Sequence, residues 1–254
     1  MTPVWLAWSS GKDAAWTLDV LLDDDDVHVT GLFTTIDRES GRVPLQNTGR
    51  ELLELQAAVT GLPLQLVELP PRASNEEYEA AFAALAARAR DEGVTTFAFG
   101  DLHLADIRTW REDLLARHGL RGVFPLWERA TSELASAMVD GGLDAVITTV
   151  DPAKIDPQWL GAGFDHAFLD ALGPTVDPCG ENGEFHTFVR GGPMFVETLE
   201  VGTGEAFDDG AFRCVEPVQR LQIDGTLDLH AIPPKQVGDL VDDYLDEARR
   251  QGVL

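Results

Sequence analysis

The stretch LAWSSGKDAAWTL, from Leu6 to Leu18, joins the end of one element to the start of another. The apolar run from Val4 to Trp8 is typical of a short strand, and the apolar residues after Asp13 repeat at helical spacing. The polar loop between them, Ser9–Asp13, contains a glycine, which lets the backbone approach a ligand closely. Unpaired amides at the start of a helix attract anions, and Lys12, one of three lysines in the chain, adds a positive charge. The loop therefore predicts a phosphate-binding site.

The same five residues also suit a serine-rich turn that only caps a helix. In that interpretation Lys12 is solvated, and Asp13 only interacts favourably with the helix dipole. The position of the loop directly after the first strand favours the phosphate site. The loop is not a Walker A loop, because Leu6 and Asp13 stand where that pattern requires a glycine and a serine or threonine.

Strands and helices alternate along the first hundred residues. β-Branched and aromatic residues predict strands over 27–35, 62–70 and 94–101, separated by helices. The clearest helix begins at Ser74, where Glu77 completes a capping box. This alternation predicts an α/β fold with a doubly wound parallel sheet, whose ligands bind at the carboxyl ends of the strands.

The second half of the chain is less regular. Its patterns predict helices over 107–117 and 131–138, a buried strand within 143–152, and short antiparallel strands within 195–230. We therefore expect a smaller α+β part at the C-terminal end. An acidic amphipathic helix is expected over 239–250, and its apolar side would pack on its own chain or on a second copy in a homodimer.

Composition narrows the classes of partner. The chain of 254 residues has 19 basic and 44 acidic residues and a formal net charge of −25, so we expect no general binding to nucleic acid. No apolar run approaches the roughly 18 residues of a membrane span, and the start of the chain lacks the pattern of a secretory signal. The two cysteines do not suggest a disulfide framework. These observations predict a cytoplasmic protein without a membrane partner.

The stretch SSGKDAAW resembles SGGKDS, the PP-loop of the ATP pyrophosphatases, which are also called the adenine nucleotide alpha-hydrolase-like group. The resemblance implies a HUP/Rossmann-like domain that binds ATP and splits it between the α and β phosphates, with the loop holding the pyrophosphate portion. Two positions depart from the pattern. Ser10 replaces a usual glycine and Ala14 a usual serine. Neither change removes the backbone amides or Lys12.

A second block, GDLHLADIRTWREDLLARHGLRGVFPLWER over 100–129, places Arg108 and Arg111 three residues apart on one helix face. Two guanidinium groups there would hold phosphates or a carboxylate in a fork geometry, although a surface helix with salt bridges has the same pattern. The block resembles one found in the diphthine–ammonia ligase branch of the family, and Pro125-Leu126-Trp127 extends the match.

A third block, DPCGENGEFHT over 177–187, resembles the GE-x-GE-Y-E-T signature of the same branch, which contributes to its substrate site. Glu181 and Glu184 converge on this glycine-containing loop, where they would bind Mg²⁺, an ammonium nitrogen or a cationic substrate. His186 replaces a glutamate of the signature and would serve as a general base or as a hydrogen-bonded structural residue. Cys179 is more typical of a small buried thiol than of a nucleophile.

The resemblance implies an ATP-dependent, amide-forming ligase that adenylates a carboxylate and transfers ammonia to it. The implied catalytic residues are Lys12, Glu181, Glu184 and His186. The implied ATP contacts are Ser9, Ser10, Gly11, Lys12, Asp13, Gly100, Asp101, Arg108 and Arg111. Asp13 and Asp101 would also hold Mg²⁺. In the family the carboxylate belongs to diphthine, a modified histidine of translation elongation factor 2. The altered third block is an argument for a subgroup that acts on another carboxylate, small or carried by another protein, so both substrates stay open.

Two rival functions have the same loop: an ATP- or AMP-binding regulator without turnover, and transfer of sulfur or another nucleophile to RNA. The acidic surface and the lack of a cysteine pair argue against the second. We divide the chain into an ATP-binding PP-loop domain (1–103), a substrate-binding part (104–200) and a C-terminal extension with the amphipathic helix (201–254).

Overall fold

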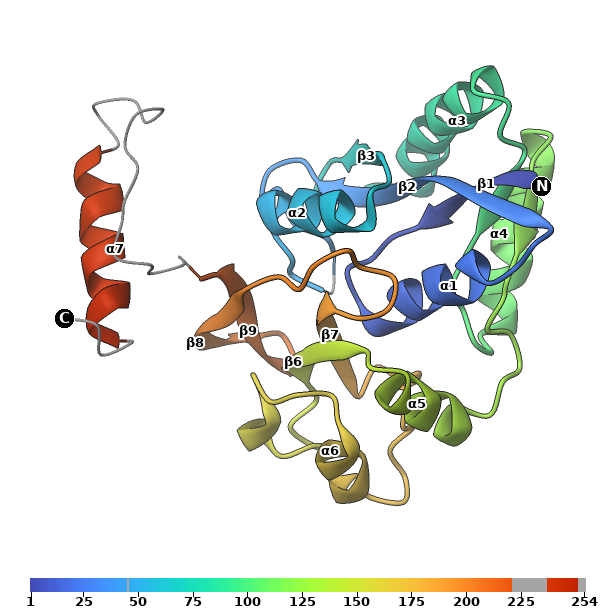
Figure 1. Cartoon of the computed structure of the whole chain (residues 1–254). Helices are drawn as coiled ribbons and strands as arrows, with labels where there is room; N and C mark the ends of the chain where they lie inside the picture. Colours follow the sequence, from blue (N-terminus) through green and yellow to red (C-terminus); the bar gives the residue numbers. More distant parts are fainter. Residues whose placement is uncertain (45, 221–236, 251–254) are drawn as a thin grey trace.

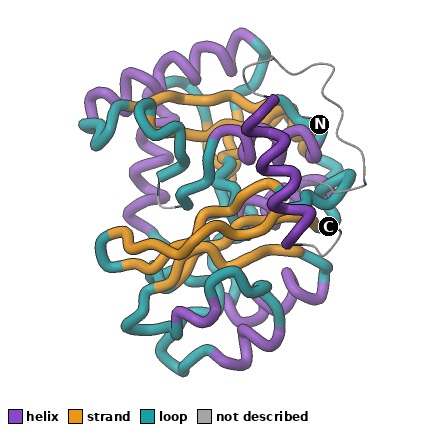
Figure 2. Tube along the Cα trace, turned by 90° about the vertical axis from the view of Figure 1, so that its left-hand side faces the viewer, coloured by secondary structure: helices purple, strands orange, loops and turns teal. Residues whose placement is uncertain are grey.

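A computed structural model describes residues 1–44, 46–220 and 237–250 of the chain. It contains a five-stranded sheet and a four-stranded sheet. Figure 2 shows the five-stranded sheet above the four-stranded one, with helices around both. The predicted α/β class with a smaller α+β part is confirmed.

The five-stranded sheet is parallel throughout, in the order β3-β2-β1-β4-β5. Its strands are β1 (Thr2–Ala7), β2 (Val27–Asp37), β3 (Leu64–Leu69), β4 (Thr96–Ala98) and β5 (Arg121–Val123). The helices between them are α1 (Lys12–Leu22), α2 (Arg50–Thr60), α3 (Asn75–Asp91) and α4 (Ala105–Arg117). The capping box predicted at the start of α3 is confirmed, because Ser74 and Glu77 hydrogen-bond each other reciprocally.

Both faces of this sheet are covered, so the sheet is doubly wound. Val4 and Leu6 of β1 pack in a core with residues of α1 and α2, whereas Trp5 between them packs in a second core with residues of α3 and α4. Successive side chains of a strand point to opposite faces, and all three of these are fully buried. A strand buried on both faces is continuously apolar, which explains the unbroken apolar run at the start of the chain.

The four-stranded sheet is antiparallel and has the order β7-β6-β9-β8. Its strands are β6 (Asp144–Val150), β7 (Phe185–Gly191), β8 (Val201–Asp209) and β9 (Phe212–Gln219), and around it lie α5 (Thr131–Asp140), a short 3₁₀ helix (Pro157–Trp159) and α6 (His166–Ala171). The antiparallel strands predicted within 195–230 are confirmed up to Gln219, and 221–230 lie outside the described residues.

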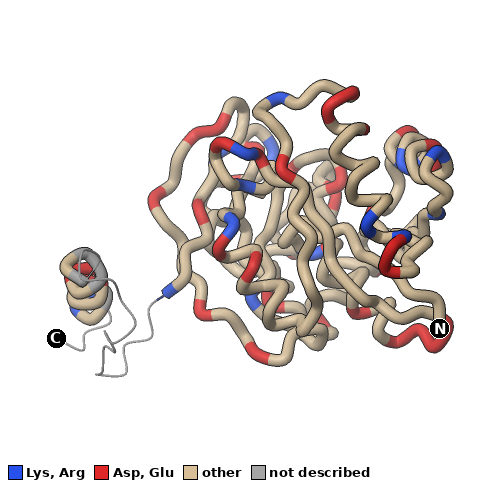
Figure 3. Tube along the Cα trace, turned by 90° about the horizontal axis from the view of Figure 1, so that it is seen from above, with Lys and Arg blue, Asp and Glu red and all other residues tan. Residues whose placement is uncertain are grey.

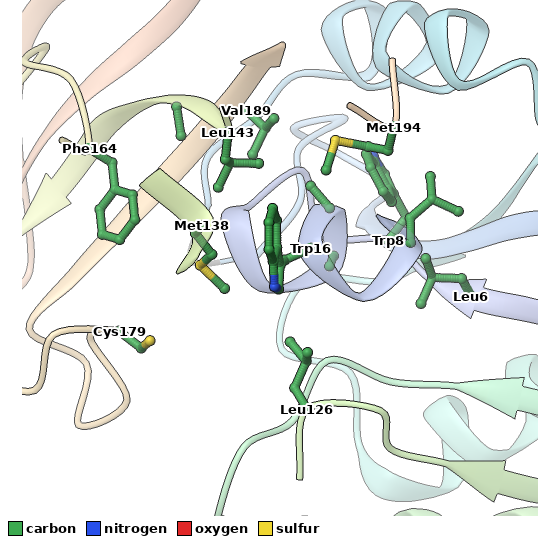
Figure 4. Close-up of a cluster of buried hydrophobic side chains, with 14 of the residues drawn as sticks. Leu6, Trp8, Trp16, Leu126, Met138, Leu143, Phe164, Cys179, Val189 and Met194 are labelled. Carbon is green, nitrogen blue, oxygen red and sulfur yellow. The ribbon is translucent and has the colours of Figure 1, made fainter. Parts of the chain in front are cut away.

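The two sheets share one hydrophobic core around α1. Figure 4 shows Trp16 on α1 with Met138 and Leu143 of the second half beside it, and Trp8 close to Met194. The parallel sheet itself continues beyond residue 103 with β5. The division of the chain at 103 and 200 stays a prediction.

The last described element is α7 (Val237–Arg250), where the sequence predicts an amphipathic helix. It lies apart from the rest of the chain in Figures 1 and 3, so its partner, including a second copy, stays a prediction. Acidic residues are spread along the whole chain in Figure 3 rather than gathered in one segment. Within 1–44, 46–220 and 237–250, no helix has the length and apolar character needed to cross a membrane.

Gly100 follows β4 at the point where the chain passes closest to α1. A Cβ atom at this position would lie 2.9 Å from both the carbonyl oxygen of Asp13 and Oγ1 of Thr17. Because the backbone of a helix has little room to move, Gly100→Ala should lower the free energy of unfolding by about 1–3 kcal/mol, measured by urea denaturation. Gly173→Ala is the matched control, because no atom lies within 4 Å of its Cβ position and its φ is outside the left-handed region. Equal stability of the two variants would contradict this account.

Candidate active site

A cavity of about 410 Å³ opens at the carboxyl ends of β1 and β4 and is closed on its other side by the start of β7. It is the edge of the parallel sheet where a ligand was expected. The structure brings eight of the predicted site residues to this cavity. They are Ser9, Lys12, Asp13, Gly100, Asp101, Arg111, Glu181 and His186.

The loop between β1 and α1 is held in place by hydrogen bonds to α2 and β7. The carbonyl oxygen of Ser10 accepts hydrogen bonds from Nε2 of Gln56 (3.1 Å) and from the amide of Val189 (3.0 Å). The same Gln56 amide donates to the carbonyl of Val189 (2.6 Å), so that α2, the loop and β7 form one network. Ser10 and Gly11 do not line the cavity. Their contact with ATP stays a prediction.

Ser10 has φ +71°, in the left-handed region that favours glycine. The family pattern has glycine here, and the structure shows how serine is accommodated. Its buried Oγ lies 2.7 Å from Oγ1 of Thr48, a fully buried hydroxyl. This hydrogen bond offsets a backbone cost of order 1 kcal/mol.

The side chain of Lys12 is almost completely buried, with 3% of the residue exposed. Its Nζ lies 2.9 Å from both carboxylate oxygens of Asp13 and donates to the carbonyl oxygen of Cys179. The ring of Phe185 is 5.4 Å away. Burial by itself would lower the pKa of the ammonium group. The charge of Asp13 and its hydrogen bond to the ammonium, together with the charges of Cys179 and Glu181, outweigh burial, so the pKa of Lys12 lies above its ordinary value. The solvated lysine of the helix-cap interpretation is therefore wrong.

The start of α1 offers free amide donors beside this lysine. The amide of Lys12 donates to Oγ1 of Thr187 (3.1 Å), and that of Ala15 donates to the carbonyl of Gly11. The amides of Asp13 and Ala14 have no partner in the part of the chain that the structure describes. Two free amides at the positive end of a helix dipole are the elements of an anion site.

The two arginines of α4 differ in position. Arg111 lies on the cavity wall, where its Nε is 2.8 Å from Oδ2 of Asp101 and its guanidinium group lies 4.4 Å from the centre of the Phe99 ring. Arg108 lies outside the cavity wall, between the rings of Phe124 (4.7 Å) and Trp127 (4.6 Å), and it pairs with Glu112. The predicted contact of Arg108 with ATP stays a prediction, and its observed contacts are those of a packed surface arginine.

Asp13 and Asp101 both reach the cavity, as the magnesium prediction requires. Each already pairs with a cationic side chain, and the described residues contain no group of three or more His, Cys, Asp or Glu that could hold a metal ion. Mg²⁺ is commonly held by one or two carboxylates together with water and substrate phosphates. The two aspartates fit such a site if a nucleotide supplies the remaining oxygens.

The loop 177–184 separates its two glutamates. Glu184 is buried, and its carboxylate accepts hydrogen bonds from the amides of Asp177 (3.3 Å) and Asn182 (2.9 Å). These are contacts of a loop anchor, and Glu184 is absent from the cavity wall described above, so its catalytic role stays a prediction. Gly180 and Gly183, both with φ +73°, make the turns that bring Glu181 to the cavity.

Burial in the cavity favours the uncharged form of both Glu181 and His186. Burial and then the charge of Asp13 raise the pKa of Glu181 to about 7. Burial and then the charge of Lys12 lower the pKa of His186. Burial raises the pKa of Cys179 to about 12, which agrees with an inert thiol rather than a nucleophile.

Five polar or aromatic residues on the cavity wall were not predicted as site residues: Gln46, Phe99, Phe185, Thr187 and Phe212. Gln46 belongs to the connection after β2, which ends at the same sheet edge, so that topology alone pointed to this segment but not to the residue. Thr187 is the last residue of the third block. Phe212 comes from β9, beyond the region that the family resemblance covered, and no sequence signal indicated it.

Comparisons with known proteins agree with the motifs. Residues 130–218 match the family model of the diphthamide synthase C-terminal domain. The chain is 27% identical over 196 residues to the diphthine–ammonia ligase of Rattus norvegicus, covering 71% of this chain and 73% of that protein. It is 27% identical over 182 residues to the Bos taurus enzyme of the same name, covering 65% and 68%. A U34-tRNA thiolase, NcsA from Methanococcus maripaludis, is similar with a TM-score of 0.32 and 14% identity over 54% of this chain and 56% of that chain, a likeness too low to carry an argument.

The parallel sheet, the free amides at the start of α1 and the matched relatives point to one class, because the chain is an α/β protein that is similar to ligases. The matched relatives are named diphthine–ammonia ligases, so the chain is similar to that family, as the motifs predicted.

The strained serine gives a stability test. Ser10→Ala keeps the left-handed backbone but removes the hydrogen bond to Thr48, so the free energy of unfolding should fall by about 1–2 kcal/mol. Ser10→Gly removes the same hydrogen bond but also removes the cost of the left-handed backbone. Its decrease in the free energy of unfolding should therefore be about 1 kcal/mol smaller than that of Ser10→Ala. Urea denaturation of both variants measures the difference, and a glycine variant less stable than the alanine variant would refute the strain.

The raised pKa of Glu181 gives a pH test. The folded protein keeps this carboxyl protonated up to about pH 7, whereas the unfolded chain ionises it at its ordinary, lower pKa. The group therefore costs stability increasingly as pH rises from about 4.5 to 7. Glu181→Gln lacks this cost, so its Tm relative to the wild type should rise between pH 5 and pH 8. The exposed Glu205→Gln control should show a constant difference, and a constant difference for Glu181→Gln as well would exclude the shift.

Proposed function

We propose that this chain is an ATP-dependent ligase that joins ammonia to a carboxylate. In this reaction a carboxylate oxygen attacks the α-phosphorus of ATP, the bond to the β-phosphate oxygen breaks, and pyrophosphate leaves. Ammonia then attacks the carbonyl carbon of the acyl-adenylate and AMP leaves. The observation that carries the proposal is the shared cavity, which is lined by Lys12, by Asp13 and Ala14 with their free amides, and by Glu181 and His186.

Each side of the cavity has its own task in this proposal. The amides of Asp13 and Ala14 donate to the departing pyrophosphate, and the charge of Lys12 stabilises it. Lys12 is oriented before ATP binds, because Asp13 and the carbonyl of Cys179 fix its ammonium group. Arg111, fixed by Asp101 and Phe99, contributes a second positive charge at the mouth. Catalysis by such fixed charges and dipoles requires little reorganisation during the reaction.

Asp13 and Asp101 would hold Mg²⁺ beside the phosphates, where the ion would supply charge neutralisation for pyrophosphate departure.

The carboxylate substrate is proposed from the relatives. The names of the matched rat and bovine proteins specify diphthine, which makes diphthine the first substrate to test. The third block departs from the family signature at Phe185 and His186, and both residues line the cavity. A different carboxylate, small or protein-borne, would be expected to exploit this altered wall. A protein substrate must present a basic face, because the chain carries a net charge of −25.

A second function, an ATP- or AMP-binding regulator without turnover, is favoured by one observation. The ammonium of Lys12 is already saturated by Asp13 and Cys179, so it would bind a nucleotide without moving to a leaving group. Tight nucleotide binding without pyrophosphate release would identify this function.

The experiment measures pyrophosphate release from ATP with Mg²⁺, ammonium chloride and diphthine-bearing elongation factor 2. We expect carboxylate-dependent release, and Lys12→Met should reduce kcat by about 100-fold or more, because it removes a fixed positive charge beside the negative charge that develops on pyrophosphate. The control is Arg88→Met, which removes an exposed partner of Glu92 on α3, outside this cavity, and should leave the rate unchanged. Unchanged pyrophosphate release by Lys12→Met would refute the assigned role.

A further inference from the structure

The cavity has more free acceptors than free donors among its side chains. Its two long cationic side chains are both engaged, Lys12 with Asp13 and Arg111 with Asp101. The side chains of Glu181 and His186 have no hydrogen-bond or ion-pair partner within the described part of the chain, although both line the cavity. His186 is held neutral by its lowered pKa and therefore offers an acceptor nitrogen.

Gln46 adds a third acceptor on the same wall. Its Oε1 is buried and has no hydrogen-bond partner among the residues described by the structure. Leaving a buried polar atom unpaired costs about 1–3 kcal/mol, so such an atom in a cavity indicates a group that a ligand pairs. The side chain lies against the phosphate-binding loop, because a Cβ at Gly11 would be 3.1 Å from Nε2 of Gln46 and 3.4 Å from the carbonyl oxygen of Thr187.

The described residues around Gln46 are held by contacts with both sheets. Arg42 donates to the carbonyl of Asn47 (2.7 Å) and pairs with Glu216 of β9 (2.6 Å). Asn47 has φ +54°, which closes the turn, and Thr48 is tied to Ser10. The turn is thus attached to both sheets, and it presents Gln46 to the cavity at a defined place.

We propose that Gln46, together with Glu181 and His186, forms a binding site for the ammonium ion. The proposal rests on the proposed ligase function, which it deepens by assigning the nitrogen substrate to its own wall of the cavity. Ammonium has four N–H donors and no acceptor, and three acceptors without a cationic side chain of their own match it. The ionised carboxylate of Glu181 would repel a phosphate or a carboxylate, so these three side chains favour a cation over an anion.

The three residues also account for the protons of the second half-reaction. Above about pH 7, where the Glu181 carboxyl is ionised, bound ammonium transfers one proton to its carboxylate, which frees the nitrogen lone pair. The nitrogen then forms a bond to the acyl carbon, and the bond from that carbon to the AMP oxygen breaks, with its electron pair leaving on AMP. The nitrogen of the new amide carries one proton too many, and His186 accepts it. Gln46 orients the nitrogen throughout and takes no proton.

A binding experiment without ATP or carboxylate tests the site directly. In about 0.5 M ammonium chloride the Tm should exceed that in equimolar sodium or potassium chloride by about 2 °C, because ligand binding to the native state stabilises it. Gln46→Leu should lose this difference, whereas Gln46→Glu, which keeps an acceptor, should retain it. The matched control is Gln158→Leu at an exposed position, which should behave like the wild type. Equal effects of ammonium and potassium, or an unchanged difference in Gln46→Leu, would overturn the proposal.

A kinetic experiment separates the site from nucleotide binding. With diphthine-bearing elongation factor 2 as the carboxylate, Gln46→Leu should raise KM for ammonium about tenfold, the effect of losing one hydrogen bond, and leave KM for ATP within about twofold. An equal rise in KM for ATP would assign Gln46 to the nucleotide and overturn the ammonium site. If the wild type shows no turnover, the proposed ligase function fails on this substrate, and the salt experiment still decides whether ammonium binds.

Discussion

The buried ammonium of Lys12 is the interaction on which the rest of the structure depends. A charge taken out of water is tolerated only when its partners are in place. The partners of Lys12 come from two distant parts of the chain. Asp13 adjoins the lysine, whereas Cys179 and Phe185 belong to the second half. Removing one partner of a buried charge typically costs about 3–5 kcal/mol. The geometry of the phosphate-binding loop is therefore tied to the correct docking of the loop 177–184, and neither half can form the cavity alone.

Much of the fold follows from local patterns, for a physical reason. A strand covered on both faces must be apolar throughout, and Val4, Trp5 and Leu6 satisfy this whatever the rest of the chain does. The capping box of Ser74 and Glu77 is equally local. The positions of Lys12 and Glu181 at the cavity followed from motifs, because each motif places a functional side chain close to a tight turn, which is made by Ser10 in the first motif and by Gly180 in the third.

Other parts of the site depend on partners that the sequence does not identify. Arg108 and Arg111 share one helix face and one chemistry, yet Phe124 and Trp127 hold the first outside the cavity while Asp101 holds the second inside. Glu184 turns inward because the amides of its own loop need an acceptor. Gln46 and Phe212 reach the cavity through the packing of one sheet on the other. Tertiary packing decides which of these side chains reaches the cavity, and the spacing of residues along the chain does not predict it.

The hydrogen bond between Ser10 and Thr48 links two positions that are far apart in sequence. Serine is acceptable in the left-handed conformation only while the threonine hydroxyl compensates for it. In homologous chains the residues at the positions of Ser10 and Thr48 should therefore co-vary. Where glycine stands at the first position, the second needs no hydroxyl and any small residue is acceptable there. Where the glycine has been lost, the hydroxyl is under selection, although it touches no ligand. A residue beneath the site thus becomes subject to the same evolutionary constraint as the residues that face it.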